Sequence, residues 1–463
     1  MCGRISTLQS VRIIVLLRVK IFNMREQQII EYKSIWKDEY LKWICGFANA
    51  QGGTLIIGKD DDGNVVGVKN AKKLLEDLPN KITTILGIVS DVNLHETEQG
   101  DYIEIVVEPQ PNPVNYKGEY HYRSGSTKQE LKGAALDKFL LKKQGKHWDS
   151  VLVPNVAIKD LSLIALQRFR NEAAKSGRVD EEVLNDETEH LLQDLQLIDE
   201  TSGNLKRAAI LLFHPKPEKM VTGAYIKIGF FQDDDEDLAF QDEVHGSLME
   251  QIDKAFDLLK SKYIVYAISY EGVSRREKPT FPTAALRESL LNAIAHKDYA
   301  SGVPIQISVY PDRIVFWNSG QLPNSISLEN LLQKHPSIPY NPDIANTLFR
   351  CGDIDVWGRG YRKIIKSVLE NKQLPPVIKN VGGLMLTYYT NANTQLKAEN
   401  IDERIIQIIE YVIANGSINN SEVQKLLNTS KPTATRLLKL AEKWLYMKNV
   451  GRKGVEYYFK RGF

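Results

Sequence analysis

The chain has 463 residues, 43% hydrophobic and 25% charged, so it is too long for one compact core and too apolar to be wholly disordered or fibrous. About three domains are expected. Sixty basic and fifty-eight acidic residues leave a formal net charge of +2, so any attraction to nucleic acid must come from local patches of positive charge. The three widely spaced cysteines (Cys2, Cys45, Cys351) support neither a disulfide framework nor a zinc site, and they favour a cytoplasmic location.

Residues 1–23 are basic and partly apolar, but Arg18 and Lys20 interrupt the apolar run, which is too short to span a bilayer. We expect a non-native or disordered extension ahead of a true start at Met24 and no membrane association. A cryptic signal peptide is the alternative.

Residues 24–150 are predicted to form an α+β module. Apolar periodicity and turn residues place its main elements as follows: a strand at 29–33, a helix at 37–50, a Gly-Gly turn into a strand at 54–58, a short strand at 65–68 and a strand at 102–107.

Residues 151–395 are predicted to form a second α/β domain with a helical lead-in at 161–195. Its expected elements are strands at 208–213 and 226–231, helices at 248–262 and 282–297, and a strand hairpin at 305–310 and 313–317. This order indicates helices packed over a sheet. A polar linker is expected at 391–399, and residues 396–463 read as a small helical domain with a terminal hairpin.

The helix at 284–297 places Glu288, Asn292 and His296 at i, i+4 and i+8, on one face. An asparagine oxygen is a hard ligand suited to Mg²⁺, and a glutamate one turn away can orient an attacking water. A polar stripe facing solvent is the alternative interpretation.

Two later segments, Asp312 to Pro323 and Gly352 to Tyr361, each combine polar residues with glycine. In this order and spacing, the helix and the two segments resemble the N box and the two glycine boxes of GHKL ATPases, in the divergent form found beside Schlafen-type AlbA domains. The phrases Ala-Leu-Arg-Glu (285–288), Ala-Ile-Ala-His-Lys-Asp-Tyr (293–299) and Asn-Pro-Asp-Ile-Ala (341–345) extend the resemblance, which covers about residues 205–390.

The resemblance implies ATP with Mg²⁺: Asn292 on the metal, Glu288 as general base, Asn318 reading the adenine edge, and Gly358 and Gly360 letting backbone amides approach the phosphates. ATP binding, weak ATPase activity and membership of the GHKL class follow as expectations.

Three further features belong to this site. Gly320 follows Asn318 in the first glycine segment, and His296 is a candidate phosphate contact or a core histidine. The sequence departs from the general GHKL pattern, which has an aspartate where Asn318 stands and a further glycine. Since asparagine offers both a donor and an acceptor, the base identity is left open.

Near the amino terminus, the phrases Glu31-Tyr32-Lys33, Phe47 to Gly63 and Tyr122 to Thr127 resemble the Schlafen AlbA-type domain from about Glu26 to Leu140. The resemblance implies nucleic-acid binding. Lys33, Arg123 and Ser124 are the candidate contacts, because guanidinium, ammonium and hydroxyl groups hold phosphates.

Nuclease-active Schlafens carry two glutamates and an aspartate as a metal-dependent RNA-cutting triad, which by position would be Glu26, Glu31 and Asp61 here. A Glu31–Lys33 surface salt bridge beside a solvated acidic turn is the alternative.

Residues 401–463 contain eleven basic and six acidic residues, and their helix–turn–helix layout with a closing hairpin resembles a winged helix-turn-helix. Lys431, Thr433 and Arg436 on the third helix, with Arg452 and Lys453 on the wing, are the candidate DNA contacts. A protein-binding winged helix is the alternative.

The sequence therefore predicts a multidomain α/β (α+β) protein: an AlbA-like module (24–150), a GHKL-type helix-over-sheet domain (151–395) and a winged helix (396–463). The expected function is an ATP-binding regulator of transcription or a defence-type effector that binds DNA or RNA as a homo-oligomer. A nucleotide-gated endoribonuclease and a catalytically inactive scaffold are the rivals. A helicase is disfavoured, because no Gly-x-x-x-x-Gly-Lys-Ser/Thr loop occurs.

Overall fold

The computed structural model describes residues 28–271, 274–323, 326–327, 331, 335–355, 358–450 and 455–460. The chain divides into two units, the first ending at Lys146 and the second beginning at His147. The extension 1–23 and the candidate site residues Glu26, Arg452 and Lys453 lie outside the described residues. Of the helices that the structure describes, none is both long and apolar enough to cross a membrane.

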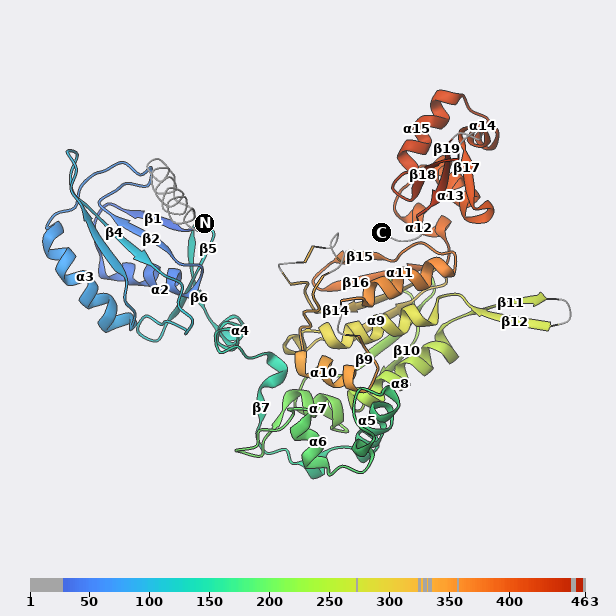
Figure 1. Ribbon diagram of the computed structural model, residues 1–463, viewed down its shortest axis with the longest axis horizontal. Helices are drawn as coiled ribbons and strands as arrows, with labels where there is room; N and C mark the ends of the chain where they lie inside the picture. The colour runs from blue at the N-terminus through green and yellow to red at the C-terminus, as the bar shows by residue number, and fades with distance from the viewer. Residues whose placement is uncertain are drawn as a thin grey trace, which may run out of the picture. The chain divides into compact units, whose positions relative to one another are not determined.

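The first unit is a four-stranded sheet in the order β1-β2-β4-β3, with β1 parallel to β2 and the other pairs antiparallel (Figure 1). Apolar residues of β2 and β4 pack on one face against the amphipathic helices α2 and α3. The elements are β1 (Ile30–Lys33), α2 (Leu41–Asn49), β2 (Gly53–Ile57), α3 (Ala71–Leu86), β3 (Asp91–His95), β4 (Tyr102–Val107), β5 (Tyr120–Ser124), β6 (Thr127–Leu131) and α4 (Gly133–Lys143).

The strands expected at 29–33, 54–58 and 102–107 and the helix at 37–50 are confirmed within a few residues. The strand expected at 65–68 is wrong: it is reduced to one bridge between Lys59 and Val65. Gly63 and Gly67 have φ values of 85° and 72°, which bend this segment away from an extended strand.

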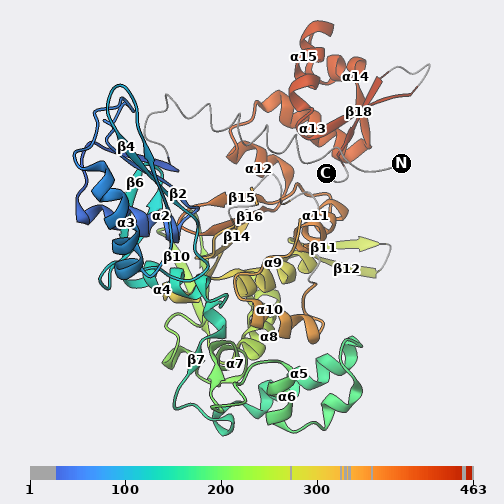
Figure 2. The same cartoon turned by 60° about the vertical axis from the view of Figure 1, so that its left-hand side comes forward.

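The second unit contains a six-stranded mixed sheet in the order β10-β9-β13-β14-β16-β15, in which β13 and β9 are parallel. Helices α8 and α9 pack on one face of the sheet, and α11 lies beside α9 (Figure 2). This is the predicted helix-over-sheet arrangement. Its elements are β9 (Ile226–Phe231), β10 (Leu238–Val244), α8 (Leu248–Leu258), β11 (Tyr266–Glu271), β12 (Ser274–Pro279), α9 (Thr283–His296), β13 (Ile305–Val309), β14 (Arg313–Asn318), α10 (Pro342–Arg350), α11 (Gly360–Glu370), β15 (Val377–Asn380) and β16 (Leu384–Tyr389).

A group of short elements precedes this sheet: β7 (Leu152–Val153), α5 (Leu163–Ser176), α6 (Thr188–Asp194), β8 (Leu205–Lys206) and α7 (Arg207–Phe213). The strand expected at 208–213 is wrong, because this segment is the helix α7, in which all residues from Ala208 to Phe213 are buried. A helix that is buried on all sides has no polar face, so its continuous apolar run cannot be distinguished from a buried strand by periodicity.

The carboxy-terminal part follows the predicted order of three helices and a hairpin, with β17 (Ser417–Asn419) added between the first two helices. Its elements are α12 (Ala392–Ala398), α13 (Glu403–Asn415), α14 (Asn420–Leu427), α15 (Lys431–Ala441), β18 (Leu445–Asn449) and β19 (Val455–Phe459). The polar linker expected at 391–399 is wrong: Asn391 caps α12 through Thr394, and Leu396 is buried in the same apolar cluster as α13.

A buried carboxylate near the start of the second unit fixes one of its helices. Asp149 Oδ2 accepts hydrogen bonds from the backbone N–H groups of Asp343 (2.8 Å) and Ile344 (3.2 Å) at the start of α10. Its other oxygen is buried and, among the described residues, has no hydrogen-bond partner. Burial raises the pKa of Asp149 to about 7, and the nearby Asp343 carboxylate adds to the rise.

This raised pKa makes stability depend on pH. In the unfolded chain an aspartate has a pKa near about 4, so the folded protein holds one extra proton between about pH 4 and 7. The free energy of unfolding should therefore fall as pH rises through this window. We expect Asp149→Asn to flatten the decline, as measured by denaturant unfolding at several pH values. Asp137→Asn, at an exposed position of α4, is the control and should leave the pH dependence of the free energy of unfolding unchanged. If Asp149→Asn keeps the same pH dependence as the unmodified chain, Asp149 is not its source.

Candidate functional site

Helix α9 carries the predicted polar stripe on the face that it turns away from the apolar core. Leu286, Leu290 and Ile294 are fully buried on the other side. Glu288 is itself 8% exposed, and burial raises the pKa of its carboxyl group, an effect that the positive charges of Lys363 and Arg287 oppose. Glu288 and Asn292 lie one turn apart, and both side chains would lie close to a Cβ atom placed on Gly360, so the stripe holds a buried carboxyl beside an amide.

A cavity of about 140 Å³ lies between this stripe, the ends of β14 to β16 and the start of α11. The structure brings together around it all six residues for which the sequence predicted cofactor binding: Asn292, His296, Asn318, Gly320, Gly358 and Gly360. Glu288 is not among the residues that line the cavity, but its Oε1 would lie 2.5 Å from a Cβ atom placed on Gly360, which does line it. Three segments separated by tens of residues thus form one site.

The two glycines of the second segment are required by their surroundings. Gly358 has a φ of 64°, which residues with a side chain rarely adopt, and a Cβ there would collide with the His335 carbonyl oxygen. A Cβ on Gly360 would stand 3.1 Å from Asn292 Nδ2, besides its contact with Glu288. Since Gly360 is the first residue of α11, the N-terminal amides of that helix face the Asn292 end of the cavity, an arrangement that suits an anion.

His296 lies at the opposite end of the stripe from Glu288. Its carbonyl oxygen contacts the Gly320 backbone, next to Asn318. Burial lowers the pKa of His296 to about 4, and the nearby His335 contributes to the decrease. With its pKa lowered to this extent the His296 imidazole is neutral near pH 7, so it would not offer a positive charge to bound phosphates.

In the first unit, Glu31, Lys33 and Arg123 form one ion-pair network. Glu31 Oε2 accepts from Arg123 Nη1 at 2.7 Å, and Glu31 Oε1 accepts from Lys33 Nζ at 2.6 Å. Glu31 and Arg123 are each 1% exposed, and the guanidinium packs on the rings of Trp43 and Phe47. Burial raises the pKa of Glu31, while Lys33 and Arg123 lower it. Arg123, expected at a nucleic-acid surface, is thus held inside the unit.

The other candidates of this unit are exposed. Asp61 lies in the turn that Asp60 closes by accepting from the N–H groups of Asp62 and Asn64, and Ser124 ends β5. Of the predicted triad, Glu31 is therefore buried and Asp61 is exposed to solvent. The third candidate, Glu26, lies outside the described residues.

Two family models match separate parts of the chain. Residues 26–132 match the family model described as Schlafen, AlbA_2, and residues 302–387 match the one described as putative ATP-dependent DNA helicase recG C-terminal. The chain combines an AlbA-type domain with an ATPase-like domain. The second match includes Asn318, Gly320, Gly358 and Gly360 and begins after the α9 stripe.

Two solved structures are similar in part. A crystal structure of a protein from Corynebacterium diphtheriae is 18% identical, with 97% of this chain and 98% of that chain covered at a TM-score of 0.47. A solution structure of the N-terminal domain of a putative ATP-dependent DNA helicase RecG-related protein from Nitrosomonas europaea is 21% identical, with 26% and 92% covered at a TM-score of 0.18. A search of curated proteins found no match.

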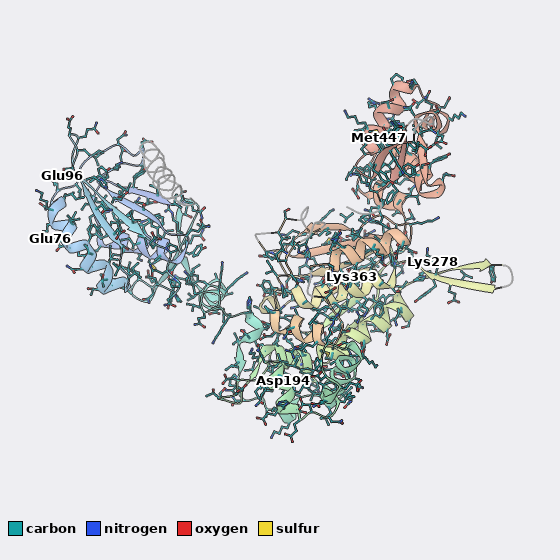
Figure 3. The ribbon with its side chains drawn as sticks, viewed as in Figure 1. Glu76, Glu96, Asp194, Lys278, Lys363 and Met447 are labelled. Atoms are coloured by element: carbon teal, nitrogen blue, oxygen red, sulfur yellow. The ribbon has the colours of Figure 1, made fainter. Side chains whose placement is uncertain are left out.

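The ATPase-like domain has polar residues at its site that the sequence analysis did not single out. Asp355 lines the cavity and pairs with Arg359 (3.0 Å) and Lys363 (3.8 Å), and Figure 3 shows Lys363 on α11. Asp355 lies inside the second glycine segment, so its acidic side chain was the signal that could have identified it. His335 also lines the cavity, but no pattern in the sequence connects it to the site.

Asp353, beside the glycine turn, connects this turn to the lead-in helix α5 and to α9. Asp353 accepts from Arg168 Nη1 of α5 (3.1 Å) and Arg287 Nη2 of α9 (2.5 Å). Arg178 donates to the carbonyl oxygens of Phe349 (2.6 Å) and Ile354 (2.8 Å). These bonds span 66 to 185 residues of sequence, so local patterns carry no sign of them.

The candidate DNA contacts of the carboxy-terminal part lie at the start of α15. Lys431 and Arg436 are exposed and Thr433 is half-buried, while Ala434, Leu437 and Leu438 pack inward. Ser430 stands at the N-cap position, but its hydroxyl bonds to Thr433 Oγ1 (3.1 Å) and not to the helix backbone. The exposed side of this helix is therefore basic.

Proposed function

We propose that the ATPase-like domain binds a Mg²⁺–nucleoside triphosphate, for which the resemblance suggests ATP, and that nucleotide occupancy changes how the chain binds DNA or RNA. The convergence of Asn292, Asn318, Gly358 and Gly360 on one cavity supports this proposal most strongly. A regulator of transcription or a defence-type effector, acting as a homo-oligomer in the cytoplasm, is the corresponding biological role.

The donor groups at the Asn292 end fit a magnesium triphosphate. An amide oxygen of Asn292 is a hard ligand, and Mg²⁺ takes few protein ligands besides phosphate oxygens. Bound there, the ion would neutralise phosphate charge. The amides at the start of α11 and the Lys363 ammonium add positive potential at the same end.

Glu288 is proposed as the general base for hydrolysis. Its carboxyl group is buried beside Asn292, and the raised pKa brings its proton affinity closer to that needed to accept a proton from water near neutral pH.

Nucleic-acid binding is proposed for the basic end of α15, with the AlbA-type domain as a second contact through Lys33 and Ser124. A metal-dependent nuclease is not part of the proposal, because both carboxylate oxygens of Glu31 are engaged by basic side chains. This contact pattern favours a structural role for Glu31 over metal binding.

The test uses the full chain and fluorescence anisotropy with labelled duplex DNA and single-stranded RNA, with and without Mg²⁺ and a non-hydrolysable ATP analogue. We expect the analogue to change the affinity, and Lys431→Ala with Arg436→Ala to weaken binding about tenfold or more, because each contact is worth about 1–3 kcal/mol. Lys439→Ala, in the last turn of the same helix, is the control. Equal affinity with and without nucleotide would contradict the coupling.

A further inference from the structure

The hairpin of β11 and β12 extends from the rest of the second unit as an arm (Figure 1). Its two strands pair with each other over their full length, and among the described residues no third strand pairs with either of them. At the base of the arm, the N–H and Oγ1 groups of Thr280 both donate to the Val265 carbonyl oxygen, at 3.0 and 2.5 Å. A two-stranded ribbon alone is marginally stable in water, which favours a partner that covers the arm.

The arm exposes large apolar side chains. Ile268 and Tyr270 are 53% and 72% exposed, and Val265, just before β11, is 68% exposed. Because Ile268 and Tyr270 lie two residues apart in β11, they share one face of the arm. Tyr266, on the same face, is half-buried and packs against the core of the second unit. The two exposed strand residues therefore lie beyond the base of the arm, where the second unit does not cover them.

The free edge of β11 is complementary to the same edge of a second copy. When two identical strands pair antiparallel about a two-fold axis, the residue on the axis faces itself and its two neighbours face each other. With position 269 on the axis, Ile268 lies opposite Tyr270 of the partner subunit, and Tyr270 lies opposite Ile268 of the partner subunit. A β-branched residue opposite an aromatic one is a stabilising cross-strand pair, and here both pairs fall on one face.

The charge of the arm favours a protein partner over nucleic acid. Residues 265–279 contain three basic and two acidic residues, and three minus two leaves a net charge of only +1. Surfaces that bind nucleic acid have a larger basic surplus, because they neutralise several phosphates. Glu277 and Lys278, neighbours in β12, are both exposed, so the described charges of this strand are of opposite sign.

We propose that two copies of this chain pair through β11 and join their arms into one four-stranded sheet. Three or more strands with an apolar face can form a stable sheet, and the pairing closes the β11 edge to other strands. The interface gives the homo-oligomer of the proposed function a specific form, a dimer with two-fold symmetry. The nucleotide site takes no part in it, so the two proposals can fail separately.

Sedimentation velocity of the full chain over a series of micromolar concentrations tests the interface. We expect a dimer with twice the 52.6 kDa mass of the chain. The double variant Ile268→Lys with Tyr270→Lys should raise the dissociation constant at least about a hundredfold, because each substitution acts twice in a symmetric dimer and adds positive charge to the interface. Leu163→Lys with Ile164→Lys, at positions 79% and 72% exposed on α5, is the matched control and should dimerise as the unmodified chain does.

A cysteine at position 269 tests the register. Pairing about this position brings the two Cα atoms to about 4.5–5.5 Å, within the range of about 4.4–6.8 Å that a disulfide spans. Ser269→Cys should therefore form a covalent dimer on mild oxidation much faster than Lys278→Cys, which places the thiol on the strand away from the axis.

Three results would overturn the inference: a monomer at every concentration, equal dissociation constants for the two lysine double variants, or equal crosslinking of the two cysteine variants. An unchanged dimer with weaker nucleic-acid binding in the Ile268 and Tyr270 variant would also overturn it, and would assign the arm to nucleic acid. None of these results would alter the expected binding of nucleotide, which the Asn292→Ala variant tests.

Discussion

Replacing Asn292 by alanine is expected to lower the affinity for Mg²⁺ with an ATP analogue by about tenfold to a hundredfold, the usual effect of disturbing a metal site. Asn292 lies between Glu288 and His296 on α9, lines the cavity and has both amide atoms close to the Gly360 backbone. The substitution removes the proposed magnesium ligand and the polar amide beside Glu288. Isothermal titration calorimetry with and without Mg²⁺ measures the effect, and the difference between the two conditions should nearly vanish in the variant.

Asn171→Ala, at an exposed position of α5, is the matched control for this prediction and should bind as the unmodified chain does. Thermal unfolding without nucleotide checks that both variants fold. An Asn292→Ala variant that keeps its affinity and its magnesium dependence would show that the α9 stripe is not the metal end of the site.

Replacing Glu31 by alanine is expected to destabilise the AlbA-type domain by about 3–5 kcal/mol, the range for removing one partner of a buried ion pair. The variant would leave the Arg123 guanidinium buried without its carboxylate, between the rings of Trp43 and Phe47. We expect faster amide hydrogen exchange throughout β1, β2 and β4 in the full chain, while the exchange of the ATPase-like domain stays unchanged.

Glu76→Ala is the control, because Glu76 is an exposed residue of α3 (Figure 3) and its loss should leave exchange unaltered. Equal exchange in the Glu31 and Glu76 variants would contradict the structural role of the ion pair. The prediction also bears on the ribonuclease alternative, since loss of RNA cutting in a Glu31→Ala protein could follow from unfolding alone. The exposed Asp61 offers a cleaner test of that chemistry.

Periodic and ordered patterns predicted much of the fold. Strands such as β4 and β9 alternate or run apolar between turn residues, and α9 carries a polar stripe of fixed spacing, so their type and bounds could be read from local residues. The residues now found around one cavity were predicted as a group because their order in the chain resembles a known site. The spacing of residues within single segments predicted only the polar stripe of α9.

The remaining features depend on tertiary contacts. The run from Ala208 to Phe213 is a helix because apolar neighbours surround it, and nothing in the run itself records those neighbours. Arg123 is turned inward by Glu31, 92 residues away, although its local phrase reads as a polar surface turn. Asp353 joins α5 to α9 through arginines that local sequence patterns do not connect. Such pairings arise only when the chain has folded.

Hydrogen exchange of the full chain tests the central claim most directly, because it locates the site as well as detecting binding. With Mg²⁺ and a saturating non-hydrolysable ATP analogue, we predict slower exchange in the second half of α9, in residues 318–322 and in the first turn of α11, and no such change in the Asn292→Ala protein. Unchanged exchange in these three segments, or protection confined to other parts of the chain, would contradict the claim that this cavity binds the nucleotide.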